Sequence, residues 1–142
     1  MSASITHVLL VEDDPHDAFF LKRALQKVRP ELPLHIVTDG EQALHYLQGH
    51  DKYANRTTYP LPSIILLDLK LPYFNGFEVL QEIRKLPNLA MLPVFVLTSS
   101  PEERDRQRAL ELGALGYFVK PPTPEMLLQI FEGTADRLRS VV

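Results

Sequence analysis

The stretch THVLLVEDDPHDAFFLKRALQKV, residues 6–28, contains an apolar segment, three consecutive acids and a helical pattern. The segment Ile5–Val11 has the length and the β-branched content of a buried strand. Asp14 followed by Pro15 is a typical helix start, with the aspartate as the capping residue and the proline at the first helical position. Apolar side chains then recur at helical spacing: Phe20, Leu21, Ala24, Leu25 and Val28. We therefore expect a strand that leads through an acidic turn into a helix.

The alternation of strand and helix recurs along the rest of the chain. Four more apolar segments have strand length: Leu34–Val37, Ile64–Leu67, Val94–Leu97 and Tyr117–Val119. Two later helices carry clear apolar stripes, which are Val79, Leu80, Ile83 and Leu86, and then Leu127, Ile130, Phe131 and Leu138. Weaker helical patterns cover Glu41–Gln48 and Glu102–Leu112.

Such an alternation implies a parallel sheet, because parallel strands need crossover connections. Five strand–helix units favour a doubly wound α/β fold over a barrel, which needs eight. We expect a flavodoxin-like fold with five helices and the strand order 2-1-3-4-5.

Two further helix starts repeat the pairing of a capping residue with proline, at Ser100-Pro101 and Thr123-Pro124. The runs 100–103 (SPEE) and 39–42 (DGEQ) also fit the reciprocal capping box. We expect helices to begin at these positions.

Composition limits the classes of protein that the chain can belong to. Its 142 residues suit one domain, with nothing left after the last helix for an output domain. With no cysteine, a disulfide framework and a thiolate metal site are excluded. The N-terminal residues do not resemble a secretory signal, and the apolar runs are too short for a membrane span. We expect a cytoplasmic protein without direct nucleic acid binding, since the net charge is −3.

Polar residues stand where the expected strands end. Glu12 and Asp13 follow the first strand, Asp68 the third, Thr98 the fourth and Lys120 the fifth. In parallel sheets of this kind, the functional residues lie beyond the carboxyl ends of the strands. Three carboxylates against one ammonium leave a charge deficit that a divalent cation would fill, and oxygen-only ligands suit Mg²⁺.

Asp68 is the candidate for chemistry. Leu71 precedes a proline and disfavours an immediate helix, so Asp68 is not an evident cap. A carboxylate beside Mg²⁺, with the Thr98 hydroxyl and the Lys120 ammonium ready to meet anionic oxygens, suits phosphoryl transfer and an aspartyl phosphate product. In the simpler interpretation, Lys120 only neutralises buried acids and Thr98 only ends a strand.

The motifs VLLVEDD, LLDLKLPYFNG, VFVLTSS and GALGYFVKPP together resemble the receiver domain of bacterial two-component response regulators. The resemblance implies that Asp68 is the phosphoacceptor. Glu12, Asp13, Asp68 and the carbonyl group of Lys70 would hold Mg²⁺, for which Mn²⁺ could substitute. The resemblance also implies that Thr98 and Lys120 contact the phosphoryl oxygens and that Tyr117 is an aromatic switch coupled to Thr98. It further implies that Pro121 follows a cis peptide bond.

The resemblance also implies partners. A sensor histidine kinase would supply the phosphoryl group, and the long loop Gly49–Pro62 resembles the insertion in response regulators paired with bacterial phytochromes. Receivers often form homodimers through the fourth helix, the fifth strand and the fifth helix. The mixed charges of 102–111 suit that surface or an ordinary solvated helix. Lys70 and Ser100 stand at positions that vary among receivers and leave the phosphate lifetime open. Pro122 stands where many receivers have phenylalanine, which leaves the mobility of that loop open.

Three other classes were weighed. Haloacid-dehalogenase-like phosphatases need a second acid two residues after the nucleophile, where this chain has Lys70. A flavin or dinucleotide module would need a glycine-rich turn after the first strand. A pseudo-receiver that binds partners without phosphorylation is the remaining alternative. A true receiver would catalyse only its own phosphorylation and dephosphorylation, and it would not be an enzyme in the usual sense.

Overall fold

The computed structural model describes residues 5–140, with side chains described up to Thr134. Five parallel strands form one sheet in the order β2-β1-β3-β4-β5, as expected. The elements, in chain order, are β1 (Val8–Val11), α1 (Pro15–Val28), β2 (Leu34–Val37), α2 (Gly40–Gln48), η1 (Asp51–Ala54), β3 (Ile64–Leu67), α3 (Gly76–Lys85), β4 (Val94–Thr98), α4 (Glu103–Glu111), β5 (Gly116–Val119) and α5 (Pro124–Ser140).

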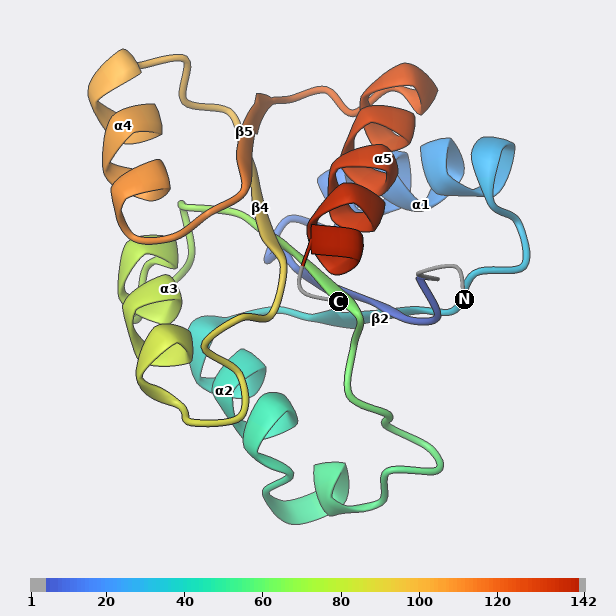
Figure 1. The fold of residues 1–142 in the computed structure, drawn as a ribbon, viewed down its shortest axis with the longest axis vertical. Helices are drawn as coiled ribbons and strands as arrows, with labels where there is room; N and C mark the ends of the chain where they lie inside the picture. Colours follow the sequence, from blue (N-terminus) through green and yellow to red (C-terminus); the bar gives the residue numbers. More distant parts are fainter. Residues whose placement is uncertain (1–4, 141–142) are drawn as a thin grey trace.

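The helices cover both faces of the sheet (Figure 1). Successive side chains of a strand point to opposite faces, so each strand contributes to two cores. Leu9 and Val11 pack with α2, α3 and α4, whereas Val8 and Leu10 pack with α1 and α5. The two apolar cores hold the five strand ends in a fixed relation.

The first strand is shorter than the sequence suggests. Ile5–Val11 was expected, but β1 begins at Val8. The amide groups of Thr6 and His7 donate to the hydroxyl oxygen of Ser63 rather than to a neighbouring strand. The Ser63 amide still donates to His7 O over 2.9 Å, so the Ser63 side chain takes over only the amide side of the ladder, and no local pattern reveals that exchange.

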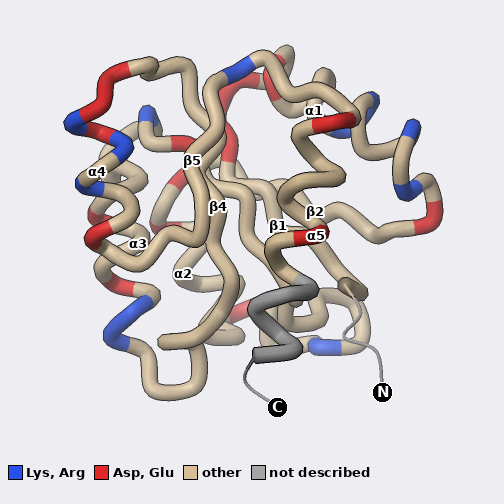
Figure 2. The backbone as a smooth tube through the Cα atoms, turned by 45° about the horizontal axis from the view of Figure 1, so that its top comes forward, with Lys and Arg blue, Asp and Glu red and all other residues tan. Residues whose placement is uncertain are grey.

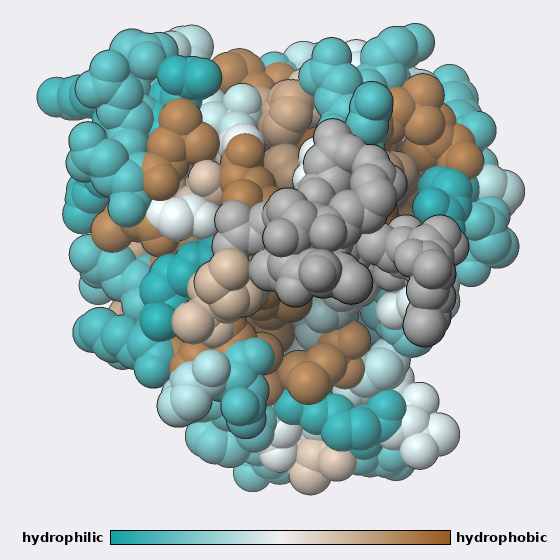
Figure 3. Space-filling view, viewed as in Figure 1, coloured by the Kyte–Doolittle hydropathy of each residue, from teal (hydrophilic) through white to brown (hydrophobic). Residues whose placement is uncertain are grey.

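The helical stripes are confirmed with one exception. Phe20 is 50% exposed, and Phe19 beside it is 57% exposed. Figure 3 shows hydrophobic atoms at the surface over α1. Leu21, Ala24 and Leu25 form the buried face of this helix instead. The side chain of Leu138 lies outside the described part of the chain.

The helix starts at Asp14 and Thr123 are confirmed. Asp14 accepts from the amide groups of His16 and Asp17, and the Thr123 hydroxyl accepts from the amide of Met126. Asp39 accepts from the amide of Gln42, but the Gln42 side chain reaches back to Thr38 instead of Asp39, so this capping box is incomplete.

The expected helix start at Ser100-Pro101 is wrong. The capping residue of α4 is Glu102, and its side chain makes no capping hydrogen bond. The Ser100 hydroxyl donates to Asp105 instead, over 2.7 Å. A complete capping box forms at Asn75 and Glu78, at the start of α3, where the sequence analysis did not expect one.

The loop between α2 and β3 is ordered by an arginine. Arg56 donates to the carbonyl oxygens of Tyr46, Leu47 and Tyr59 over 2.8 to 3.2 Å. Two of these carbonyl groups, those of Tyr46 and Leu47, lie in the last turn of α2, where carbonyl groups lack partners further along the helix. The buried Tyr46 hydroxyl donates to Pro60 O over 2.9 Å. No helix in the described part of the chain is long and apolar enough to cross a membrane.

Candidate functional site

The sheet register brings the strand ends to one place. Val11 of β1 pairs with Leu67 of β3, so Glu12 and Asp68 are the next residues on neighbouring strands. The Asp68 amide donates to Val11 O over 3.1 Å. On the other side, the Lys120 amide donates to Thr98 O over 2.8 Å and fixes the end of β5 against β4. The fold therefore holds these residues through backbone hydrogen bonds.

Three carboxylates gather at this edge. Oxygen atoms of Glu12, Asp13 and Asp68 lie within 4.8 Å of one another. Glu12 and Asp68 are buried, with 3% and 4% of their surface exposed, whereas Asp13 is exposed. Figure 2 shows acidic residues along the edge of the sheet between β5 and α1. The possible ligand atoms are all oxygens, and the exposed Asp13 leaves the cluster accessible from solvent, which fits a hard divalent cation.

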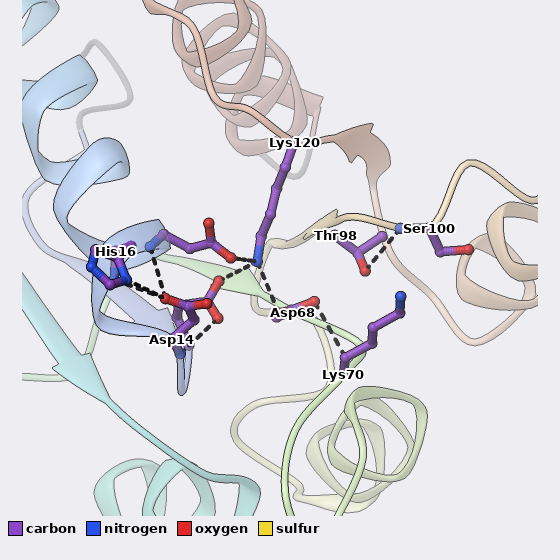
Figure 4. A network of polar contacts seen from close by, with 9 residues as sticks. Asp14, His16, Asp68, Lys70, Thr98, Ser100 and Lys120 are labelled. Atoms are coloured by element: carbon purple, nitrogen blue, oxygen red, sulfur yellow. Dashed lines mark hydrogen bonds and ion pairs between the residues drawn. The ribbon is translucent and has the colours of Figure 1, made fainter.

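Lys120 faces these acids from β5. Its Nζ atom lies 2.5 Å from Glu12, 2.8 Å from Asp17 and 3.0 Å from Asp68 (Figure 4 shows Lys120 above Asp68). Burial alone would lower the pKa of Lys120, but the hydrogen bonds to Asp17, Glu12 and Asp68 outweigh it and raise that pKa. Lys120 therefore stays an ammonium group and aims one donor at Asp68.

Asp17 is the member of the site that the sequence analysis missed. It lies in the first turn of α1, which begins after the capping residue Asp14. The weak signal was a fourth acid three residues after Asp14, on the helix that follows the acidic turn. Its partner Lys120 is 103 residues away, so only the folded chain reveals the contact.

The carboxyl group of Glu12 is a weaker acid than usual. Burial raises the pKa of Glu12 to about 7, although the hydrogen bond from Lys120 opposes this effect. The negative charge of Asp68 raises it further. A dication beside Glu12 would favour the ionised carboxylate, as the proposed ligand role requires.

Thr98 ends β4 near Asp68, and Tyr117 of β5 bonds to the segment that follows Thr98. Thr98 is completely buried, and Asp68 lies between Lys120 and Thr98 in the view of Figure 4. The Ser100 amide lies 3.5 Å from the Thr98 hydroxyl oxygen, and the Tyr117 hydroxyl donates to Ser100 O over 2.8 Å. The segment that follows β4 thus connects the Thr98 hydroxyl to the side chain of Tyr117.

The loop after Asp68 is tightly constrained. The Lys70 amide donates to Asp68 Oδ1 over 3.2 Å, while its side chain is exposed. Gly76 packs against this loop, because a β carbon there would meet the Asp68 carbonyl oxygen and Leu69 Cα. The peptide bond between Lys120 and Pro121 is cis.

The fold and this arrangement match a known family. Residues 8–132 match the response regulator receiver domain. The chain therefore belongs to the receiver domains of two-component response regulators.

The individual relatives include phytochrome-associated proteins. Response regulator Rcp1 of Synechocystis sp. is 37% identical over 126 residues, which are 89% of this chain and 84% of Rcp1. The crystal structure of the Mn²⁺-bound form of Rcp1 has a TM-score of 0.74 at 36% identity and covers 92% of this chain and 90% of that one.

Two further structures are similar. The bacteriophytochrome response regulator RtBRR is 39% identical, with a TM-score of 0.81 and coverage of 92% of this chain and 78% of that one. The phosphorylated cyanobacterial phytochrome response regulator RcpA is 34% identical, with a TM-score of 0.77 and coverage of 98% and 97%. The chain is thus related to phytochrome response regulators over most of its length.

Proposed function

We propose that this receiver accepts a phosphoryl group on Asp68 from a phosphohistidine of a sensor histidine kinase. The observation that carries the proposal is the position of Asp68, which is buried beside the Lys120 ammonium and clustered with Glu12 and Asp13. The kinase would be of the phytochrome type, as the names of RtBRR and RcpA suggest.

In the transfer, an Asp68 carboxylate oxygen attacks phosphorus. A P–O bond forms and the P–N bond of the phosphohistidine breaks, with its electron pair left on the ring nitrogen. The ring leaves as neutral imidazole because its other nitrogen carries a proton in the reacting phosphohistidine. Lys120 is placed to meet the negative oxygens of the group, and Thr98 is placed to donate a hydroxyl. Slow attack of water on the acyl phosphate would reset Asp68.

Glu12, Asp13, Asp68 and the carbonyl oxygen of Lys70 would hold Mg²⁺, with Mn²⁺ as a substitute. Bound there, the cation would offset the charge of the acids and of the phosphoryl oxygens. Support comes from the oxygen donor set and from the Mn²⁺-bound relative Rcp1. The three carboxylates of this cluster repel one another, and a bound dication would offset that repulsion.

Phosphorylation would change the surface of α4, β5 and α5 through Thr98 and Tyr117, and the output would be a protein contact or onward phosphotransfer. We propose a homodimer through that surface, without direct nucleic acid or membrane binding, in the cytoplasm. Figure 2 shows acids and bases alternating on α4, and Figure 3 shows a mostly hydrophilic surface there. Such a dimer contact would rely on ion pairs.

The test is the intact mass of the protein after incubation with acetyl phosphate and Mg²⁺. We expect one added phosphoryl mass, which disappears in Asp68→Asn and in the presence of EDTA. If hydrolysis is too fast to see it, beryllofluoride should bind the parent and not Asp68→Asn. Failure of both assays in the parent would favour a receiver that binds partners without phosphorylation.

A further inference from the structure

Ser100 joins three elements of the switch region, β4, β5 and α4, through hydrogen bonds. Its hydroxyl donates to Asp105 Oδ2 over 2.7 Å and lies 3.4 Å from the amide of Glu102. Its carbonyl oxygen accepts from Tyr117 of β5 over 2.8 Å, and its amide lies 3.5 Å from the Thr98 hydroxyl oxygen. Only 7% of Ser100 is exposed. The side-chain and main-chain groups of one residue thus contact β4, β5 and α4.

Asp105 is placed for this contact and not for an ion pair with its neighbours. It lies in the first turn of α4, and the capping residue Glu102 makes no side-chain capping hydrogen bond. The arginines on either side pair with other acids, Arg104 with Glu102 and Arg106 with Glu103. Asp105 reaches back to the segment before the helix instead, and its bond to Ser100 is a charge-assisted one.

The bond fixes the orientation of the Ser100 peptide. If Asp105 did not hold the hydroxyl, the Ser100 side chain would keep only its longer contact, of 3.4 Å, with the Glu102 amide, and the segment between β4 and α4 would be held less firmly. The carbonyl oxygen that receives the Tyr117 hydroxyl would then be free to turn. Tyr117 is only partly buried, so its ring has room to leave once that acceptor moves.

We propose that Asp105 is a positioning residue that holds the Ser100 carbonyl oxygen as the acceptor for Tyr117 and so sets the balance between two positions of the Tyr117 ring. The inference rests on the proposed phosphoryl switch. By reciprocity, if the Ser100–Asp105 bond favours the inward ring, and a phosphoryl group favours the same arrangement through Thr98, each strengthens the other.

The first test needs neither metal nor phosphoryl group. The chain has five tyrosines, so fluorotyrosine labelling gives five ¹⁹F resonances, and Tyr117→Phe assigns one of them. We expect Asp105→Ala and Ser100→Ala to move the Tyr117 resonance toward the exposed position. The matched control is Glu103→Ala, which also removes an acid from the first turn of α4 but breaks only the exposed pair with Arg106.

The second test measures beryllofluoride affinity in the presence of Mg²⁺. We expect Asp105→Ala and Ser100→Ala each to weaken binding about three- to tenfold, as the loss of one hydrogen bond implies. The double variant should lose no more than either single one, because both remove the same interaction. Glu103→Ala should bind like the parent.

A Tyr117 resonance that stays at the parent position in Asp105→Ala would overturn the inference. The same shift in Glu103→Ala would also overturn it, since the effect would then come from helix charge. If the parent fails to bind beryllofluoride, the proposed function fails, but the fluorine spectra still decide whether Asp105 positions Tyr117.

Discussion

At the scale of single residues, the site depends on contacts between side chains distant in sequence. Glu12, Asp13, Asp68, Thr98 and Lys120 could be predicted, because each follows or ends an apolar strand and parallel strands place such residues together. Asp17 could not be predicted as a site residue, because its place in the first turn of α1 is by itself enough to explain an acid there. Its contact with Lys120 depends on how α1 sits against the end of β5.

Asp13 gives a prediction on thermal stability that differs between a buffer with EDTA and a buffer with Mg²⁺. Asp13→Asn removes one of three carboxylates whose oxygens lie within 4.8 Å of one another. In EDTA the acids repel, so the variant should unfold about 2–5 °C higher than the parent. Mg²⁺ should raise the midpoint of the parent by binding its native state and should leave that of the variant nearly unchanged.

Thermal unfolding followed by circular dichroism measures both effects. The control is Glu125→Gln, an exposed acid in the first turn of α5, which should keep the gain from Mg²⁺. A parent that gains nothing from Mg²⁺ would contradict the proposed metal site.

His35 gives a prediction for pH. Burial lowers the pKa of His35 below its ordinary value of 6.5, and the charge of His7 lowers it further. Its ring lies against Tyr46 and Tyr59, with centroids 5.8 and 6.0 Å away. The neutral ring is favoured in the native state, so stability is full above about pH 6.5 and falls as the pH drops through the lowered native pKa.

Urea unfolding at about pH 7.5 and about pH 5.5 tests this expectation. The parent should lose more free energy of unfolding between these values than His35→Gln does. Other acids titrate in both proteins, and the difference between the two isolates the histidine. Equal losses would mean that His35 is protonated as readily in the native protein as in the unfolded chain.

At the scale of elements, local patterns predict strands better than helix starts. Four strands begin and end within one residue of the expected positions, because apolar runs and burial agree there. The predicted start of α4 was wrong. Ser100 has the residue type of a capping residue and is followed by proline, but its hydroxyl donates to Asp105 and its carbonyl oxygen accepts from Tyr117. Tertiary hydrogen bonds override the local preference at that position.

The start of α3 gives a prediction on packing. Gly76 begins this helix, and a β carbon there would meet the Asp68 carbonyl oxygen and Leu69 Cα. Gly76→Ala should therefore lower the free energy of unfolding by about 1–3 kcal/mol and slow phosphorylation, because the backbone of the acceptor must shift.

The matched control is Gly133→Ala in the middle of α5. A β carbon there meets only Phe95, at an ordinary contact distance of 3.5 Å. This change should stabilise the protein by about 0.5–1 kcal/mol, since alanine favours a helix over glycine. Urea unfolding should give opposite signs for the two substitutions, and equal signs would contradict the packing argument.

At the scale of the whole molecule, the proposed homodimer depends on the charges of α4. Arg106→Glu reverses one of them and also loses the pair with Glu103, which spans 3.2 Å. We expect the phosphorylated or beryllofluoride-bound variant to be mostly monomeric in sedimentation velocity, whereas the parent forms dimers. Lys22→Glu on the exposed face of α1 is the control and should leave dimers intact, and an unchanged oligomeric state in Arg106→Glu would count against this surface.

The parallel sheet also separates the molecule into two edges. The acids, Lys120 and the switch residues lie at the carboxyl ends of the strands, while the loop 49–62 joins the end of α2 to the beginning of β3 at the opposite edge (Figure 1). The candidate site and the loop 49–62 are thus on opposite sides of the molecule.

That loop has a consequence for protease sensitivity. Long surface loops are the usual sites of nicking, and this one contains two residues after which trypsin cuts, Lys52 and Arg56. Arg56, however, is bound to three backbone carbonyl groups, and the Lys52 ammonium lies over the rings of Tyr53 and Tyr59. A protease needs an extended, accessible backbone, so the native loop should resist trypsin, and cleavage after Arg56 would report that the end of α2 has already come apart.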